Sequence, residues 1–228
     1  MKQPRLFEFR MGDRAPDALV VTEANRQAAQ LLTDWRAWPG GALALAGPPG
    51  SGKTHLALAW ALEAGARGLL PTSTAEAGAQ AFAETGGRLV IEDADRGLDE
   101  AMLWRVLDLT RAAGGAVLLT GAAPPAQWPV RTPDLASRLA AMPVARLHEP
   151  DAALMEIVLR RICREQFIFL SDDAARYWAD RLPRTFAAAR VVVAALDAEL
   201  TRGAKPVSLA AARKALARAT TELGKAEG

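Results

Sequence analysis

The chain has 228 residues, half of them hydrophobic, and a net charge of +2 at pH 7. This composition indicates a folded protein with one large or two modest domains, and the overall charge does not by itself require a nucleic-acid partner. The single cysteine, Cys163, excludes an internal disulfide, and its apolar setting favours a buried thiol. Two histidines without a Cys/His cluster argue against a structural zinc site.

The first segment, residues 1–11, is too short to build a core, yet it carries Leu6, Phe7 and Phe9 beside Gln3. These side chains could fold back onto the following domain. They could equally form a docking peptide, with apolar anchors for a pocket and a glutamine for its rim. The sequence lacks an apolar signal segment here, and no later apolar run approaches the ~18 residues of a membrane span, so we expect a cytoplasmic protein.

A short strand-like piece at 17–21 precedes a predicted amphipathic helix from Thr22 or Glu23 to about Trp38. Residues 39–41, Pro-Gly-Gly, end this helix. A second apolar run at 41–46 has the length of a buried strand.

Residues 47–54, Gly-Pro-Pro-Gly-Ser-Gly-Lys-Thr, match the P-loop pattern at every fixed position. Gly50 and Gly52 lack a Cβ, so the backbone can curl and turn its N–H groups onto phosphate oxygens. Lys53 supplies a cation for the β- and γ-phosphates, and the Thr54 hydroxyl can reach Mg²⁺. The strand before the loop and the predicted helix after it are the context that the motif requires, so the sequence predicts nucleotide binding. The apolar segment upstream is a candidate wall for an adenine ring.

After a short strand at 68–72 and a helix at 74–85, the run 88–93 reads Arg-Leu-Val-Ile-Glu-Asp. An apolar strand that ends in two acids beside a P-loop is the Walker B arrangement. We expect Glu92 to bind the hydrated Mg²⁺ and Asp93 to orient the attacking water.

Alternating elements continue with a helix at 98–113, a strand at 116–121, a segment at 133–139 and a strand at 144–147. Strands alternating with helices predict a parallel sheet covered on both faces. After residues 148–150 no further strand is expected. Four helices follow, at 151–166, at 171–182 with Ser171 as N-cap, from Pro183 to Gly203, and from Ser208 to about Leu223.

The layout of a P-loop sheet domain followed by a small helical lid resembles that of AAA+ ATPases. Within them, Gly-Pro-Pro-Gly-Ser-Gly-Lys-Thr-His-Leu at 47–56 resembles the P-loop of the DnaA family. Thr120-Gly121 with Pro124-Pro125, and then Pro-Asp-Leu-Ala-Ser-Arg-Leu at 133–139, are similar to the corresponding run of the Hda-type regulators of that family. Those regulators lack the long N-terminal domains and the helix-turn-helix domain of DnaA, and we expect the same layout here.

The resemblance implies an α/β AAA+ fold, with a five-stranded parallel sheet between helices at 12–149 and an all-helical lid at 150–228. Residues 1–11 would then be a clamp-binding peptide, because Gln3, Leu6 and Phe7 fit the family's Gln-x-x-Leu-apolar pattern. The implied partners are the sliding clamp, which is the β subunit of bacterial DNA polymerase III, and DnaA. DNA would be contacted mainly through the clamp, and homo-oligomers are compatible with the family.

The resemblance also implies roles for individual residues. Arg138 matches the arginine finger that acts on ATP bound to a neighbouring protomer, Thr120 stands at sensor 1, and Asp93 completes the catalytic set. The cofactor is ADP or ATP with Mg²⁺, and Thr54 and Glu92 are the metal-side residues. The implied nucleotide contacts are Gly47, Pro48, Gly50, Ser51, Gly52, Lys53, Thr54 and His55, the adenine region Leu19, Val20, Val21 and Asn25, and Arg184 at sensor 2.

Two departures from the family pattern leave the chain's own ATP hydrolysis open. Glu92 stands where an Asp is usual and is one methylene longer, which changes its reach to the Mg²⁺ water shell. At sensor 2 the alignment places Ala187, with Arg184 and Arg190 on either side. Neither departure affects Arg138.

The alternative function is an ATP-dependent helicase loader or transposition helper, which would need basic and aromatic surfaces for single-stranded DNA. A third possibility is a metabolic kinase that uses the same P-loop. It is disfavoured because the sequence carries no recognisable kinase substrate or lid motif.

Overall fold

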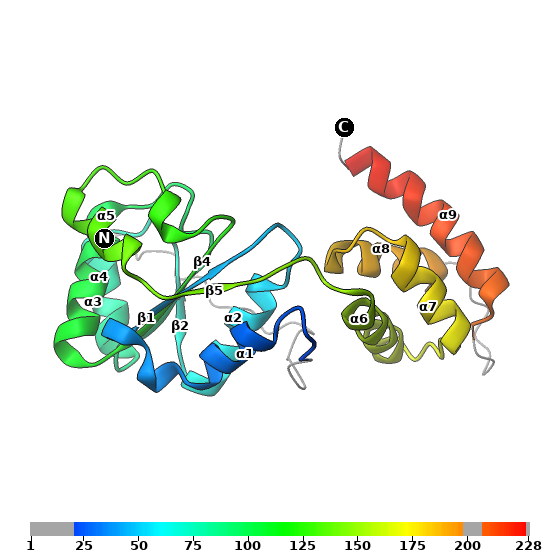
Figure 1. Cartoon of the computed structure of the whole chain (residues 1–228), viewed down its shortest axis with the longest axis horizontal. Helices are drawn as coiled ribbons and strands as arrows, with labels where there is room; N and C mark the ends of the chain where they lie inside the picture. Colours follow the sequence, from blue (N-terminus) through cyan, green and yellow to red (C-terminus); the bar gives the residue numbers. More distant parts are fainter. Residues whose placement is uncertain (1–20, 198–206, 227–228) are drawn as a thin grey trace, which may run out of the picture. The chain divides into compact units, whose positions relative to one another are not determined.

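The computed structural model describes residues 21–197 and 207–226, which fall into two compact units. The sheet unit consists of residues 25–48 and 52–148, and the helical unit consists of the described residues from Glu149 onward together with the short segments 21–24 and 49–51. Each unit has its own hydrophobic core, and we describe each by itself (Figure 1).

The sheet unit is built on a five-stranded sheet in the order β2-β3-β4-β1-β5. All neighbouring strands are parallel, as the alternation of strands and helices predicts. The strands are β1 (Ala42–Ala46), β2 (Arg67–Leu69), β3 (Arg88–Ile91), β4 (Ala116–Gly121) and β5 (Val144–Arg146). Because β3, β4 and β1 are neighbouring parallel strands, their carboxyl ends lie at the same edge of the sheet.

Helices cover both faces of this sheet, which explains why its strands are almost uninterrupted apolar runs. Leu43 and Leu45 point to the core shared with α1 and α2, whereas Ala42 and Ala44 point to the core shared with α3, α4 and α5. The helices are α1 (Arg26–Thr33), α2 (Lys53–Ala64), α3 (Ala75–Glu84), α4 (Glu100–Ala113) and α5 (Pro133–Ala140).

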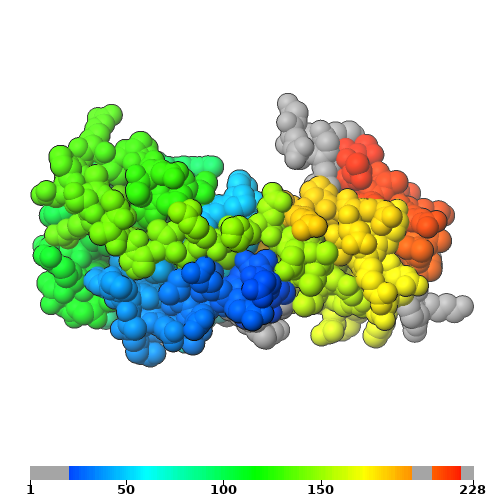
Figure 2. Space-filling model, in the orientation of Figure 1, coloured from blue at the N-terminus to red at the C-terminus, as the bar shows by residue number. Residues whose placement is uncertain are grey.

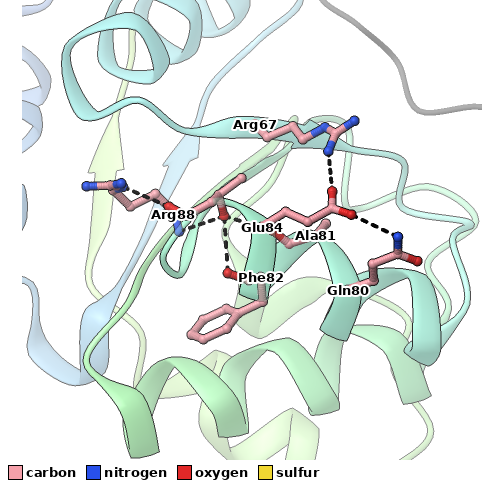
Figure 3. A network of polar contacts seen from close by, with 7 residues as sticks. Arg67, Gln80, Ala81, Phe82, Glu84 and Arg88 are labelled. Carbon is pink, nitrogen blue, oxygen red and sulfur yellow. Dashed lines mark hydrogen bonds and ion pairs between the residues drawn. The ribbon is translucent and has the colours of Figure 1, made fainter.

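Polar contacts fix the end of α3 against the amino-terminal ends of β2 and β3 (Figure 3). Glu84 pairs with Arg67 and accepts a hydrogen bond from Gln80. The Thr85 hydroxyl accepts from the Arg88 backbone N–H, and the Arg88 Nε donates to the Thr85 carbonyl. These side chains therefore hold the edge of the sheet opposite to the P-loop.

The region before β1 differs from the predicted long helix. α1 ends at Thr33 and is followed by two 3₁₀ turns, η1 (Trp35–Ala37) and η2 (Pro39–Gly41). The Trp38 indole stacks on Trp60 with ring centroids 5.1 Å apart, and its Nε1 donates to the Leu31 carbonyl at 2.7 Å. This tertiary packing outweighs helix propensity, which is only a weak preference.

The helical unit contains α6 (Ala152–Glu165), α7 (Asp172–Arg181), α8 (Phe186–Asp197) and α9 (Leu209–Ala226). Its core includes Trp178 and Cys163. The Trp178 Nε1 donates to the Ala212 carbonyl at 2.8 Å. Burial raises the pKa of the Cys163 thiol to about 12, and the thiol is buried as predicted.

The helix starts in this unit follow their capping side chains. Ser171 caps α7 as predicted, with its hydroxyl accepting from the Ala174 N–H. The predicted start of α8 at Pro183 is wrong, because the Thr185 hydroxyl accepts from the Ala188 N–H and the helix begins at Phe186. The predicted end at Gly203 lies outside the described residues. Within the described ranges, no helix combines the length and hydropathy needed to cross a bilayer.

Candidate functional site

The P-loop connects β1 to α2 at the carboxyl edge of the sheet. Gly50 and Gly52 have φ values of +77° and +94°, in the left-handed region where a side chain would be strained. The Gly47 N–H donates to the Gly121 carbonyl at 3.2 Å, which ties the start of the loop to the end of β4. The sequence therefore needs glycine at these two positions to curl the loop over this edge.

Lys53 closes the loop from inside. Its Nζ donates to the Gly47 carbonyl at 2.7 Å and to the Pro48 carbonyl at 3.0 Å. An ammonium has three donors, so one remains for a ligand. Burial lowers the pKa of Lys53, and the carboxylates of Asp93, Asp95 and Glu92 act in the opposite direction. The ammonium therefore lies within the field of three acids.

Glu92 and Thr54 meet across the site. The Thr54 Oγ1 donates to Glu92 Oε2 at 2.9 Å, while Glu92 Oε1 is buried and has no hydrogen-bond partner. Burial raises the pKa of Glu92, and the hydrogen bond from Thr54 opposes this shift. A buried carboxylate oxygen without a partner is costly, and a hydrated cation next to it would relieve that cost.

Two further observations test whether these residues fit a nucleotide with magnesium. The Ser51 hydroxyl is buried without a hydrogen-bond partner, so the loop carries a polar group to which phosphate oxygens could bind. Among the described residues, no group of three or more His, Cys, Asp or Glu could hold a metal ion by itself. Magnesium in phosphate sites takes only one or two protein ligands, so the donor set fits.

Asp93 lies in the turn after β3, and Thr120 on β4 holds this turn. Asp93 has a φ of +50°, and its N–H donates to the buried Thr120 Oγ1 at 3.0 Å. The Thr120 carbonyl accepts from the Ala94 N–H at 2.8 Å. Thr120 therefore holds a strained turn of the kind that is concentrated at functional sites.

We predict that Thr120→Val lowers the free energy of unfolding by about 1–3 kcal/mol, because the Asp93 N–H loses its acceptor. Thr110→Val is the matched control, since both hydroxyls are buried but that of Thr110 donates to the Val106 carbonyl and accepts no hydrogen bond from a backbone N–H. Urea denaturation measures both variants. Equal losses in the two would show that the Asp93 turn does not depend on Thr120.

Asp95 is a third acid at this edge that the sequence analysis did not single out. Its Oδ2 accepts from the Ala122 N–H at 2.8 Å, and its Oδ1 is buried without a hydrogen-bond partner. With Trp128 and Arg131 it lines a surface pocket of about 320 Å³. The signal for Asp95 was present in the sequence, because it is the third acid after the β3 strand.

Arg138 lies on α5, packed against α4. Its guanidinium carbon is 3.8 Å from the centroid of the Trp104 ring, and its Nη2 is 3.5 Å from Asp108 Oδ1. The side chain is 26% exposed. Figure 2 shows the surface of this part of the sheet unit, where the residues around 100–140 are coloured green.

The structure thus brings Lys53, Thr54, Glu92, Asp93 and Thr120 together, with His55 in the first turn of α2. Val21 is 50% exposed, Asn25 is buried, and Arg184 is exposed in the turn before α8 of the helical unit. Gln3, Leu6, Phe7, Leu19 and Val20 lie outside the described residues.

Comparisons with known proteins give matches at the level of structure. No protein-family model and no curated protein sequence matches the chain. Domain III of the Thermotoga maritima replication initiation protein DnaA aligns with a TM-score of 0.69 and 18% identity, covering 90% of this chain and 96% of that one.

Two other solved structures align over most of the chain. The Thermotoga maritima RuvB Holliday junction branch migration motor aligns with a TM-score of 0.67 and 19% identity, covering 87% of this chain and 70% of that one. DnaA from Aquifex aeolicus bound to AMPPCP aligns with a TM-score of 0.55 and 19% identity, covering 72% of this chain and 59% of that one. The chain therefore has the α/β AAA+ fold of DnaA and RuvB, with a helical C-terminal part.

Proposed function

We propose that this protein is an Hda-type regulator that stimulates the hydrolysis of ATP bound to DnaA and so limits replication initiation. It would dock on the DNA-loaded sliding clamp through Gln3, Leu6 and Phe7 and present Arg138 to the ATP of DnaA. The observation that carries the proposal is the Pro-Asp-Leu-Ala-Ser-Arg-Leu helix α5, which places a part-buried arginine on a chain with a DnaA-like fold. An arginine at the edge of a shared nucleotide site is the usual activator of such hydrolysis.

The chain's own P-loop would hold ADP or ATP. Backbone N–H groups around Gly50 and Gly52, with the remaining donor of Lys53, would bind the phosphates. Thr54 and Glu92 would hold Mg²⁺, which neutralises charge on the phosphate oxygens when bound. Solved DnaA structures contain the nucleotide analogue AMPPCP, which supports this assignment by analogy of fold.

The bound nucleotide would serve mainly to brace the fold. Glu92 is longer than the usual Asp of this position, and Thr120 already uses its hydroxyl to hold the Asp93 turn. Arg184 or Arg190 would be the residue at sensor 2. Arg138 needs none of these features, because it acts on ATP bound to another protein.

A clamp-binding measurement tests the docking step. We predict that changing Gln3, Leu6 and Phe7 together to Ala weakens the affinity for the β clamp at least about 30-fold, because a single anchor residue is often worth 2 kcal/mol or more. Surface plasmon resonance with immobilised clamp gives the affinity. Arg5→Ala is the matched control, since Arg5 lies inside the segment but outside the pattern. Unchanged affinity in the triple variant would exclude docking through these residues.

Absence of clamp binding in the unmodified chain would favour the alternative, an ATP-dependent loader. That alternative has one supporting observation in the helical unit. Phe167 and Phe169, in the turn after α6, are 92% and 70% exposed, and exposed aromatic rings are suitable platforms for nucleic-acid bases. Binding of a fluorescent single-stranded oligonucleotide in the presence of ATP would then separate the two functions.

A further inference from the structure

Two residues of α4, Trp104 and Asp108, contact the guanidinium of Arg138. Trp104 and Asp108 are four residues apart, so they share one face of the helix. The Arg138 guanidinium lies over the ring of the first, at 3.8 Å, and within 3.5 Å of the carboxylate of the second. We call Trp104 and Asp108 the arginine cradle.

The two contacts restrict the guanidinium in different ways. Stacking on the Trp104 face fixes the plane of the group without using any of its N–H donors. Asp108 faces only one terminal nitrogen, Nη2, and its contact is longer than a good hydrogen bond. Most of the five donors of the guanidinium therefore stay available for phosphate oxygens.

The charge around the cradle also stays positive. Asp108 is shared between Arg138 and Arg111, whose Nη2 is 4.0 Å from the same carboxylate oxygen. One negative charge therefore faces two positive ones. An anion that approaches Arg138 meets a cluster with a net charge of +1 and not a neutralised pair.

We propose that Trp104 and Asp108 are positioning residues that hold Arg138 in the orientation it needs to act on ATP bound to a partner protein. This inference rests on the proposed function, because it concerns the same arginine. An arginine on a long free side chain would lose rotamer freedom each time it engaged the phosphate, and a preformed orientation avoids that loss. The cradle thus acts on the rate of hydrolysis and not on the affinity between the proteins.

The test measures stimulated hydrolysis of ATP on DnaA, with DNA-loaded clamp, as a function of the concentration of this protein. Trp104→Leu and Asp108→Asn are each expected to lower the maximal rate about two- to fivefold, in line with the strength of a part-exposed stacking or ionic contact. The half-saturating concentration stays unchanged. Trp104→Phe keeps an aromatic face and retains more than half of the maximal rate. Arg105→Ala, an exposed neighbour on α4, is the control and leaves both parameters unchanged.

The variants separate this inference from the proposed function. If the unmodified protein does not stimulate hydrolysis, the proposed function is wrong. The proposed function holds if the unmodified protein stimulates hydrolysis and Arg138→Ala does not. In that case, a normal maximal rate in both Trp104→Leu and Asp108→Asn overturns only the inference about the cradle. A higher maximal rate in Asp108→Asn also overturns it, because Asp108 would then compete with the phosphate. Equal loss in Trp104→Phe and Trp104→Leu would contradict a role for the aromatic face.

Discussion

Replacing Arg138 with Ala is expected to abolish the stimulation of DnaA-bound ATP hydrolysis while leaving clamp binding intact. An arginine supplied in trans to a phosphoryl-transfer site is worth about 10³–10⁵ in rate, because its charge and donors stabilise the transferring group. Single-turnover hydrolysis of labelled ATP preloaded on DnaA, in the presence of DNA-loaded clamp, measures this effect directly.

The controls for this variant follow from its surroundings. Arg138 contributes one part-exposed ion pair and one stacking contact, so Arg138→Ala should lower the free energy of unfolding by no more than about 1–2 kcal/mol. Arg138→Lys keeps a positive charge but loses the planar fork, and we expect most of the stimulation to be lost. Stimulation retained by Arg138→Ala would remove the arginine from the mechanism, whatever the clamp affinity.

The carboxyl edge of the sheet shows what the sequence could predict about the site. The P-loop and the two acids after β3 were found because their chemistry depends on short local patterns, and β1, β3 and β4 were found because buried parallel strands are continuous apolar runs. The hydrogen bond between Thr54 and Glu92 follows from the parallel arrangement, which brings the ends of β1 and β3 to one edge.

Features that depend on tertiary contacts were not predictable in the same way. The break after Thr33 depends on the stacking of Trp38 on Trp60, which are far apart in the sequence. The cradle needs α5 to pack against α4, and no local pattern links Trp104 to Arg138. Asp95 was missed for a different reason. The Walker B pattern contains only two acids, Glu92 and Asp93, but Asp95 also lies at the carboxyl edge of the sheet, near Lys53.

Glu92 connects the electrostatics of the site to its ligand. A carboxyl whose pKa is raised in the folded state contributes stability below its unfolded pKa, and this contribution is lost as the pH rises through the folded value. Once the pH has risen above the folded pKa, the ionised Glu92 is therefore a cost to the empty fold. A cation next to its unpartnered Oε1 would offset this cost, so nucleotide with Mg²⁺ should stabilise the sheet unit.

Lys53 is the cation already present in this acidic site, and Lys53→Met should have the second large effect. The variant loses the charge that faces the phosphates and the two hydrogen bonds to the Gly47 and Pro48 carbonyls. Because a hydrogen bond to a charged group is worth about 1.5–3 kcal/mol, we expect the affinity for ADP with Mg²⁺ to fall about 10- to 150-fold. Isothermal titration calorimetry measures this affinity without relying on the stability of the variant.

The control for Lys53→Met is a lysine whose charge lies away from the P-loop. Lys214→Met removes an exposed lysine from α9 and should leave the affinity unchanged, so a loss confined to Lys53→Met assigns it to the loop. Removing Lys53 also takes the ammonium away from Glu92, Asp93 and Asp95, so the three acids repel the phosphates more strongly. A Lys53→Met variant that bound ADP as tightly as the unmodified chain would show that this loop is not the nucleotide site. The same result would leave the role of Arg138 untouched, because that residue acts on the nucleotide of a different protein.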